Sequence, residues 1–168
     1  MVQLVPMIEE AFHAFLAQAV PDYADEHIRS GDWSAEDAVE RSAAEFHSLL
    51  PDGITTPGHY LFTIYDPALQ QGVGMLWFAE RGPEGNRTAF VYNLWIDEPF
   101  RRRGYATQAF LAMEPYARAL GLNAIALHVF GHNQAAQALY AKLGYCVTNV
   151  MMKKTLGNPA DGQGDARA

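Results

Sequence analysis

The sequence predicts an α/β fold in which a central mixed, mostly antiparallel sheet is flanked by helices on both faces. Three observations favour this class. Apolar residues recur at helical spacing through the first 50 residues, and three extended runs then follow one another between residues 60 and 96. From residue 104 onward, helical and extended patterns alternate, which is typical of strands joined by helical crossovers.

The first third of the chain is predicted to be helical. Residues 2–5 form a short apolar start that fits an edge strand, and residues 8–19 have their apolar side chains at helical spacing. Pro21 is expected to interrupt that helix, and a second helical stretch follows over residues 22–28. Ser34 has the features of an N-cap for the next helix. The apolar face of that helix consists of Val39, Ala43, Phe46 and Leu50.

Three strands are predicted next, after a cluster of turn-forming residues at 51–58. The runs 60–65, 73–79 and 88–96 are rich in aromatic and β-branched residues. A turn with Gly and Pro at 81–86 joins the last two. These features indicate an antiparallel meander.

The last third is predicted to alternate between helix and strand. A helix over 104–120, a strand over 123–130 and a helix over 134–143 precede a strand or hairpin over 145–156. Pro115 lies inside the first of these helices and is expected to kink it.

The composition fits one domain over residues 1–156. The chain has 168 residues, of which 49% are hydrophobic, and this is enough for one substantial core. Residues 157–168 offer almost nothing to bury, so we expect a disordered tail. The chain lacks a run of roughly 18 apolar residues and a secretory signal, so we expect a cytoplasmic protein without a membrane partner. Cys146 is the single cysteine, which excludes an internal disulfide framework and a zinc-ribbon site.

The charge is negative overall and unevenly distributed. The net charge is -7, which disfavours a nucleic-acid partner. The first 58 residues hold 11 acidic side chains and 2 basic ones. Such a field attracts a cation to the first third and leaves the rest free to hold an anion. An equally good interpretation is that two solvated helices happen to be acidic.

The segment 94–107 carries the clearest signal for chemistry, because it runs from the end of a strand through a basic turn into a helix. The N–H groups at a helix start lack partners and the helix dipole is positive there, so such a turn can wrap a phosphate or pyrophosphate. Three arginines add charge and forked donors. The alternative is a solvated basic loop. The residues concerned are Leu94, Trp95, Ile96, Arg101, Arg102, Arg103, Gly104, Tyr105, Ala106 and Thr107.

Two motif blocks in order carry a family resemblance. Arg101, Gly104 and Ala106 match a signature of Gln or Arg, two residues, Gly, one residue, then Gly or Ala. A second block follows at Leu127, His128, Val129, Asn133, Ala136, Leu139, Tyr140, Lys142, Gly144 and Tyr145. Over roughly residues 60–154, the sequence therefore resembles the GNAT superfamily of acetyl-CoA-dependent N-acyltransferases.

The resemblance implies a specific fold and cofactor site. The family has a mixed sheet of about seven strands. Its fourth strand, here ending at Leu94, Trp95 and Ile96, carries a bulge and diverges from the next strand, here within 124–130, which leaves a slot for pantetheine. The turn from Arg101 to Thr107 would hold the pyrophosphate of acetyl-CoA, and Asn133 would lie beside the pantetheine arm.

The resemblance also implies catalytic roles. Tyr140 matches the family's frequent general acid, which contacts the cofactor and protonates the departing thiolate; a packed aromatic is the alternative. Many relatives have a Glu on the fourth strand, but residues 88–94 contain no acid. His128 stands where branches of the family that act on protein N-termini carry a Glu in the fifth strand, which makes it a candidate for the base, with packing or hydrogen bonding as its alternative role. Glu80, acting through water, and a water path are the other candidates.

The expected function is N-acetyl transfer from acetyl-CoA to a primary amine within a ternary complex, without a metal. The acceptor is expected to be a small cationic amine, or a Lys side chain or N-terminus of a peptide. Members of the family are often dimers, so the resemblance allows a homodimer. The rival hypothesis is a non-catalytic acyl-CoA-binding or sensor module.

Overall fold

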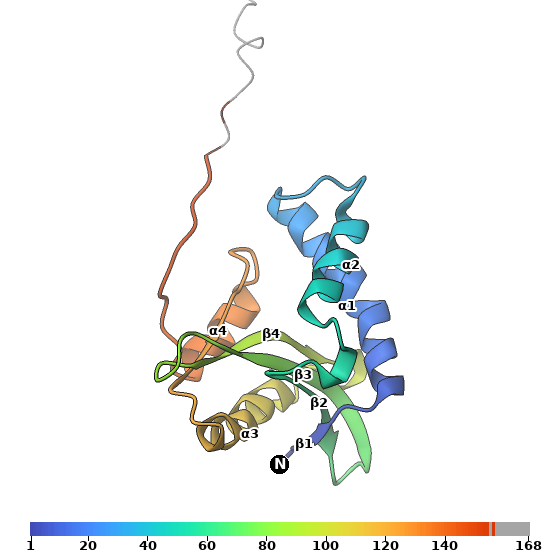
Figure 1. Ribbon diagram of the computed structural model, residues 1–168, viewed down its shortest axis with the longest axis vertical. Helices are drawn as coiled ribbons and strands as arrows, with labels where there is room; N and C mark the ends of the chain where they lie inside the picture. Colours follow the sequence, from blue (N-terminus) through green and yellow to red (C-terminus); the bar gives the residue numbers. More distant parts are fainter. Residues whose placement is uncertain (155, 157–168) are drawn as a thin grey trace, which may run out of the picture.

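The computed structural model describes residues 1–154 and residue 156, which build one five-stranded mixed sheet with helices on both faces (Figure 1). The strand order is β1-β2-β3-β4-β5; the first four strands are antiparallel, and β5 is parallel to β4. In chain order the elements are β1 (Gln3–Pro6), α1 (Glu9–Ser30), α2 (Ala38–Leu49), β2 (His59–Asp66), β3 (Gln71–Arg81), β4 (Thr88–Ile96), α3 (Tyr105–Ala119), β5 (Ala124–Leu127) and α4 (Gln134–Lys142), with 3-10 turns at Gly53–Thr55 and Glu98–Phe100.

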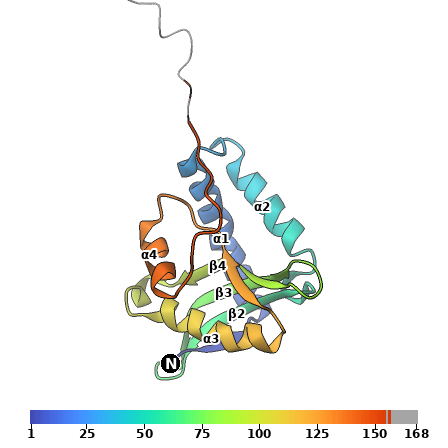
Figure 2. The ribbon, with the colours of Figure 1, turned by 90° about the vertical axis from the view of Figure 1, so that its left-hand side faces the viewer.

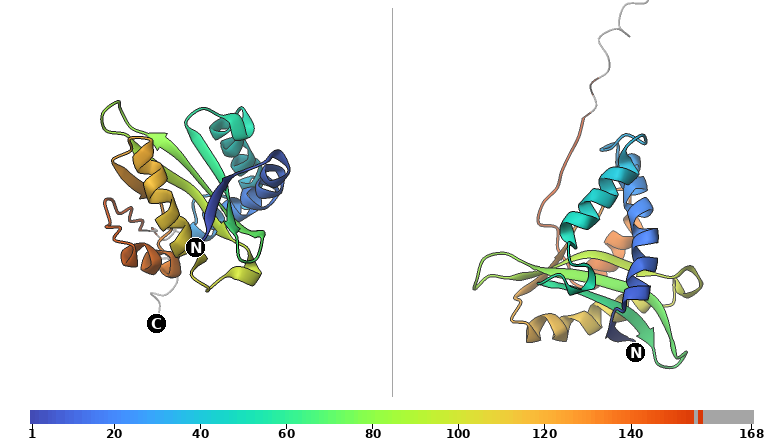
Figure 3. Two further views of the ribbon diagram at one scale, coloured as in Figure 1. Left: turned by 90° about the horizontal axis from the view of Figure 1, so that it is seen from below. Right: turned by 45° about the vertical axis from the view of Figure 1, so that its right-hand side comes forward.

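The helices form two layers around the sheet. Helices α1 and α2 cover one face, and α3 lies across the other (Figure 3). Neighbouring residues of β3 pack alternately against the two helix layers, because successive side chains of a strand point to opposite faces. Trp77 packs against Phe15 and Phe46 of the α1/α2 layer, and Phe78 belongs to the cluster that contains Phe110 of α3. The predicted fold class is confirmed.

Helix α1 does not end at Pro21, contrary to the sequence prediction. It continues from Glu9 to Ser30, with buried residues both before and after the proline. A proline inside a helix costs roughly 3 kcal/mol through its missing N–H and a steric clash. Burial of Phe15 and Ala24, on the two sides of the proline, offsets this cost. Helix α3 likewise includes Pro115.

The start of α2 also differs from the prediction. The helix begins at Ala38, and residues 35–37 form a turn. The hydroxyl of Ser34 accepts the N–H of Glu36 at 3.3 Å instead of capping the helix. Serine side chains readily make such local bonds in turns, which compete with helical capping.

The strand or hairpin predicted over 145–156 is not formed. Residues 145–154 have no regular secondary structure, so the described part of the sheet has five strands instead of about seven. Lys153 donates to the carbonyl of Gly31 at 2.7 Å, so the segment passes the end of α1 instead of following β5 (Figure 2). Its apolar side chains are therefore exposed: Val147, Val150, Met151, Met152 and Leu156.

Two further sequence expectations concern the limits of the chain. The tail predicted over 157–168 lies outside the described residues. Among the helices that the structure describes, none is long and apolar enough to cross a membrane.

Candidate functional site

A β-bulge lies in the middle of β4. Trp77 of β3 pairs with Asn93, and the next residue, Phe78, pairs with Val91, so Tyr92 is an extra residue without a partner of its own in β3. A bulge of this kind bends its strand and increases the local twist. The bulge that the resemblance implied is therefore present.

Strands β4 and β5 separate just after this point. Their parallel pairing runs from Thr88 and Ala124 to Val91 and Leu127, and β5 ends there. The downstream residues of β4, which include Leu94, Trp95 and Ile96, have no partner in β5. Backbone groups of this stretch that lack a partner in the protein can bond an extended ligand, because unpaired backbone polar groups need a partner. The divergence implied by the resemblance is thus also present.

The turn after β4 leads into the N-terminus of α3. Gly104 occupies the N-cap position with φ +81°, and no side chain caps the helix. The first backbone bond of α3 runs from Gln108 N–H to the Gly104 carbonyl. Within the described residues, the amides of Tyr105, Ala106 and Thr107 have no acceptor. These N–H groups and the positive end of the helix dipole can bind an anion.

The side chains of this turn have different tasks. Arg101 donates from Nε to the carbonyl of Ile96 at 2.9 Å, and its guanidinium lies 4.3 Å from the centre of the Trp95 ring. Arg101 therefore braces the turn, whereas Arg102 and Arg103 are exposed and free to meet phosphate oxygens. Tyr105 donates to Asp66 Oδ2 at 2.5 Å, and this bond raises the pKa of Tyr105.

Helix α4 carries the second motif block. Asn133 is its N-cap, and its side-chain oxygen accepts the N–H of Ala136 at 3.1 Å. Tyr140 is half-buried, and its ring meets Phe110 of α3 edge-on at a centroid distance of 5.5 Å. Burial raises the pKa of Tyr140, so this phenol keeps its proton at neutral pH.

His128 follows the last residue of β5 directly. Its side chain is exposed, and its ring lies edge-on to Phe130 at 5.1 Å. It therefore lies at the point where β5 leaves the sheet and faces solvent, which is a position from which a proton can leave.

Glu80 has a different environment. It accepts from the Tyr60 hydroxyl at 2.6 Å and forms an ion pair with Arg87. Burial and the bond to Glu80 raise the pKa of Tyr60 to about 12. Glu80 pairs with Ala89, on the other side of the bulge from the unpaired end of β4. The structure thus does not bring Glu80 together with Tyr140 and the turn.

Helix α1 approaches both ends of the stretch of β4 after Val91 that β5 does not pair with, which we call the open region. Glu26 contacts Nε2 of His132 in the β5–α4 loop at 2.5 Å. Burial and the neighbouring Asp25 raise the pKa of Asp22, and the charge of Arg101 opposes this shift. The C-terminal half of α1 therefore lies near both the basic turn and the β5–α4 loop. The sequence did not reveal these contacts, because they join residues far apart in the chain.

An aromatic cluster fills the same end of α1. His27 stacks on Trp33 at 4.0 Å, and it meets Tyr23 and Phe130 edge-on at 4.5 and 5.2 Å. The spacing of Tyr23 and His27, four residues apart on one helix, was the one sequence signal for it. The cluster connects the α1/α2 layer to the loop that carries His132.

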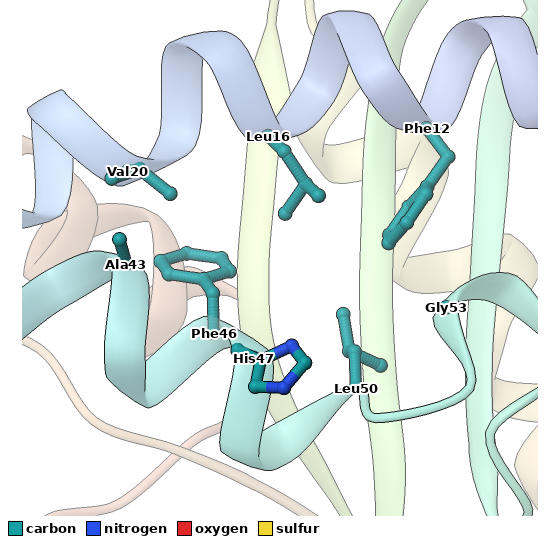
Figure 4. A pocket seen from close by; sticks show the side chains of 8 residues that line it. All are labelled: Phe12, Leu16, Val20, Ala43, Phe46, His47, Leu50 and Gly53. Atoms are coloured by element: carbon teal, nitrogen blue, oxygen red, sulfur yellow. The ribbon is translucent and has the colours of Figure 1, made fainter.

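A separate groove lies between α1 and α2 (Figure 4). It encloses about 330 Å³, and its lining is almost wholly apolar, with His47 as the one titratable group. The lining residues are Phe12, Leu16, Val20, Ala43, Phe46, His47, Leu50 and Gly53. None of the predicted site residues lines it. Within the described residues, no group of three His, Cys, Asp or Glu side chains could hold a metal ion.

Comparisons with known sequences all find acetyltransferases. A model described as "Acetyltransferase (GNAT) family" matches residues 20–145. The chain is 38% identical over 157 residues to a Bacillus subtilis protein named uncharacterized N-acetyltransferase YycN, covering 92% of this chain and 99% of that protein. It is 36% identical over 153 residues to uncharacterized N-acetyltransferase YdgE of the same organism, covering 91% and 97%.

Solved structures show the same similarity. The crystal structure of B. subtilis YycN matches with a TM-score of 0.89 and 37% identity, over 94% of this chain and 100% of that chain. An aminoglycoside antibiotic 6'-N-acetyltransferase from Acinetobacter baumannii matches with a TM-score of 0.59 over 94% of this chain and 100% of that chain. At 23% identity, the latter match shows the fold alone.

Proposed function

Because the chain belongs to the GNAT family of acetyltransferases, we propose that it transfers an acetyl group directly from acetyl-CoA to a primary amine while both substrates are bound. The observation that carries the proposal is the continuous path from the unpaired end of β4 to the uncapped N-terminus of α3. A family fold alone does not establish an activity, so the proposal rests on this site.

The residues of the path fit acetyl-CoA. The amides of Tyr105, Ala106 and Thr107, together with Arg102 and Arg103, suit the pyrophosphate, since they provide donors and positive charge without a competing carboxylate cap. The backbone of Leu94, Trp95 and Ile96 has no partner in β5 and suits the amide groups of a pantetheine arm, except for the Ile96 carbonyl, which already accepts from Arg101. In this arrangement Gly104 and Arg101 shape the turn, and Asn133 starts the helix that carries Tyr140.

The chain's own residues then manage two protons. Acetyl-CoA supplies the activated acyl group as a thioester. Tyr140 holds its proton through neutral pH and delivers it to the departing sulfur. His128 takes the proton that the attacking amine loses, directly or through water, because an imidazole nitrogen can act as a proton acceptor. This role for His128 predicts a lower kcat for His128→Ala, with a pH profile that differs from that of the wild type.

The acceptor is proposed to be cationic, as a small amine or a Lys side chain or N-terminus of a peptide. The acidic side chains of α1 support this proposal, since Asp22 lies near Arg101 and Glu26 near the β5–α4 loop. A cation approaching this region meets a negative potential.

A non-catalytic acyl-CoA sensor is the second candidate. The observation that favours it is the lack of an acidic residue in 88–94, combined with the ion pair that engages Glu80. Such a module would bind acetyl-CoA without consuming it in the presence of any amine.

The deciding experiment is a calorimetric titration with acetyl-CoA. Wild type is expected to bind, and Gly104→Glu is expected to abolish binding, because a carboxylate would occupy the anion site at the start of α3. Gly121→Glu is the matched control: Gly121 also has a positive φ and open space around its Cβ position, but it lies after the C-terminal end of α3. A wild type that does not bind acetyl-CoA, or equal binding by a folded Gly104→Glu variant, would contradict the proposal.

A further inference from the structure

We infer that the side chain of Asn93 binds the acceptor amine at the upstream end of the open region. The inference rests on the proposed function and goes beyond it by naming the group that orients the nucleophile. Three properties of Asn93 carry it: the face to which it points, its position along β4, and its free hydrogen-bonding capacity.

The bulge determines the face. Residues directly opposite each other in an antiparallel pair share a face of the sheet, and Asn93 lies opposite Trp77. Trp77 packs against Phe15 and Phe46 of the α1/α2 layer, so Asn93 points to that layer as well. Tyr92 stacks on Trp77 at 4.4 Å and points the same way. Because of the bulge, two consecutive side chains thus face α1 and α2, and Asn93 does not enter the apolar core under α3.

The position along β4 places Asn93 where the reacting atoms should meet. Val91 is the last β4 residue that pairs with β5, and Asn93 comes two residues later. The proposed phosphate site lies beyond the other end of the unpaired stretch, at the start of α3. A cofactor that is anchored there and extends along β4 brings its acyl end to the neighbourhood of Asn93. An acceptor that arrives on the α1/α2 side meets the thioester at this carboxamide.

The carboxamide is also available. It is half-buried, and within residues 1–154 its side chain makes no hydrogen bond, although it is not sealed from solvent. The amide can therefore exchange water for a ligand. Its oxygen can accept one N–H of the amine and leave the nitrogen lone pair directed at the thioester.

A neutral partner suits the chemistry. In the transfer, the amine nitrogen forms a bond to the acyl carbon and the carbon–sulfur bond breaks; one proton leaves the nitrogen towards His128 or water, and Tyr140 supplies one to the sulfur. A carboxylate at position 93 would stabilise the ammonium form and raise the pKa of the amine. The carboxamide oxygen orients the amine without this penalty, so more of the bound acceptor is neutral and reactive.

The test compares steady-state kinetics of wild type, Asn93→Ala and the nearly isosteric Asn93→Leu. The acceptor is the amine that wild type acetylates fastest in a panel that includes 1,4-diaminobutane and a Lys-containing peptide. We expect KM for the amine to rise about tenfold, near the upper end of the range for one lost neutral hydrogen bond, with KM for acetyl-CoA unchanged. Asn86→Ala in the exposed β3–β4 turn is the control and should match wild type.

A second readout separates binding from a merely structural effect. Asn93→Asp keeps an acceptor oxygen, so its KM for the amine should stay close to the wild-type value. The carboxylate should raise the pKa of the bound amine, so the rise of kcat with pH should occur at higher pH than in the wild type. An active wild type with the same amine KM in folded Asn93→Ala and Asn93→Leu overturns this inference and leaves the proposed function standing. A wild type that binds acetyl-CoA but acetylates no amine overturns both.

Discussion

Tyr140 has a packing role, and a single substitution can separate this from the chemical role that we propose for it. Its ring fills space against Phe110, and its hydroxyl is not needed for that contact. Tyr140→Phe is therefore expected to fold and to bind acetyl-CoA normally, but to lower kcat by about 10²-fold or more, as for a lost general acid. Rapid measurement of thiol release, with calorimetry for acetyl-CoA affinity, checks both parts.

The neighbouring Tyr145 provides the matched control. It also packs against Phe110, at 5.8 Å, and burial raises its pKa as well. Tyr145→Phe should leave kcat close to the wild-type value. If both variants, or neither, lose activity, Tyr140 is not the acid.

The pH dependence follows from the raised pKa of Tyr140. A free phenol loses its proton near pH 10, and burial moves this loss to higher pH. We therefore expect no loss of kcat due to Tyr140 as the pH rises from 7 to 9.5, since the acid form persists throughout that range. A decline of kcat in this window in wild type that Tyr140→Phe does not show would mean that the phenol titrates there, contrary to the burial seen.

One buried hydroxyl links α2 to α1, in addition to the apolar packing between the two helices. Ser42 of α2 is fully buried and donates to the carbonyl of Val20 at 2.7 Å, next to Pro21. Ser42→Val removes this bond and adds volume at a filled site, so we expect the free energy of unfolding to fall by about 1–3 kcal/mol. Urea denaturation measures the change. Ser48→Val, on the exposed side of the same helix, should shift it by less than about 0.5 kcal/mol, and an equal loss in both variants would count against this account.

The elements that the sequence predicts well are those with strong local signals. The runs 60–65, 73–79 and 88–96 correspond to β2, β3 and β4 within two residues at each end. Helix α3 was predicted one residue too long at each end. The predicted strand over 123–130 is shorter in the structure, because β5 pairs with β4 only as far as Leu127. Continuation of α1 past Pro21 depends on tertiary packing, which local patterns do not contain.

The candidate site was predictable in the same uneven way. Gly104 and the arginines form a contiguous motif, so the turn was found from the sequence. Asn93, which we propose to bind the acceptor, was not predicted, because the bulge breaks the alternation on which a strand's faces are assigned. Nothing in the residue types of β4 marks the position of the extra residue. The contact of Glu26 with His132 joins residues more than 100 positions apart and has no local signature.

At the scale of the whole molecule, the uneven distribution of charge supports the proposal of an anionic cofactor and a cationic acceptor. The basic turn at Arg101–Arg103 faces the proposed phosphates, whereas the acidic first third holds 11 acidic and 2 basic residues. We expect the enzyme to favour 1,4-diaminobutane over 4-amino-1-butanol, which has nearly the same length but one cationic group fewer. The ratio of their kcat/KM values should be about tenfold at low salt and should fall towards one at about 0.5 M NaCl, where screening shortens the reach of the field.

The comparison of two amines under identical conditions cancels the effect of salt on acetyl-CoA binding. That effect is expected in its own right, because screening also weakens the attraction between the arginines and the phosphates. A charge-reduced variant adds a second test: Asp22→Asn together with Asp25→Asn should lower the diamine preference while the rate with 4-amino-1-butanol changes little. If the preference is absent at low salt, or is unaffected by the double substitution, the acidity of α1 reflects only a solvated helix face and the acceptor is selected by shape.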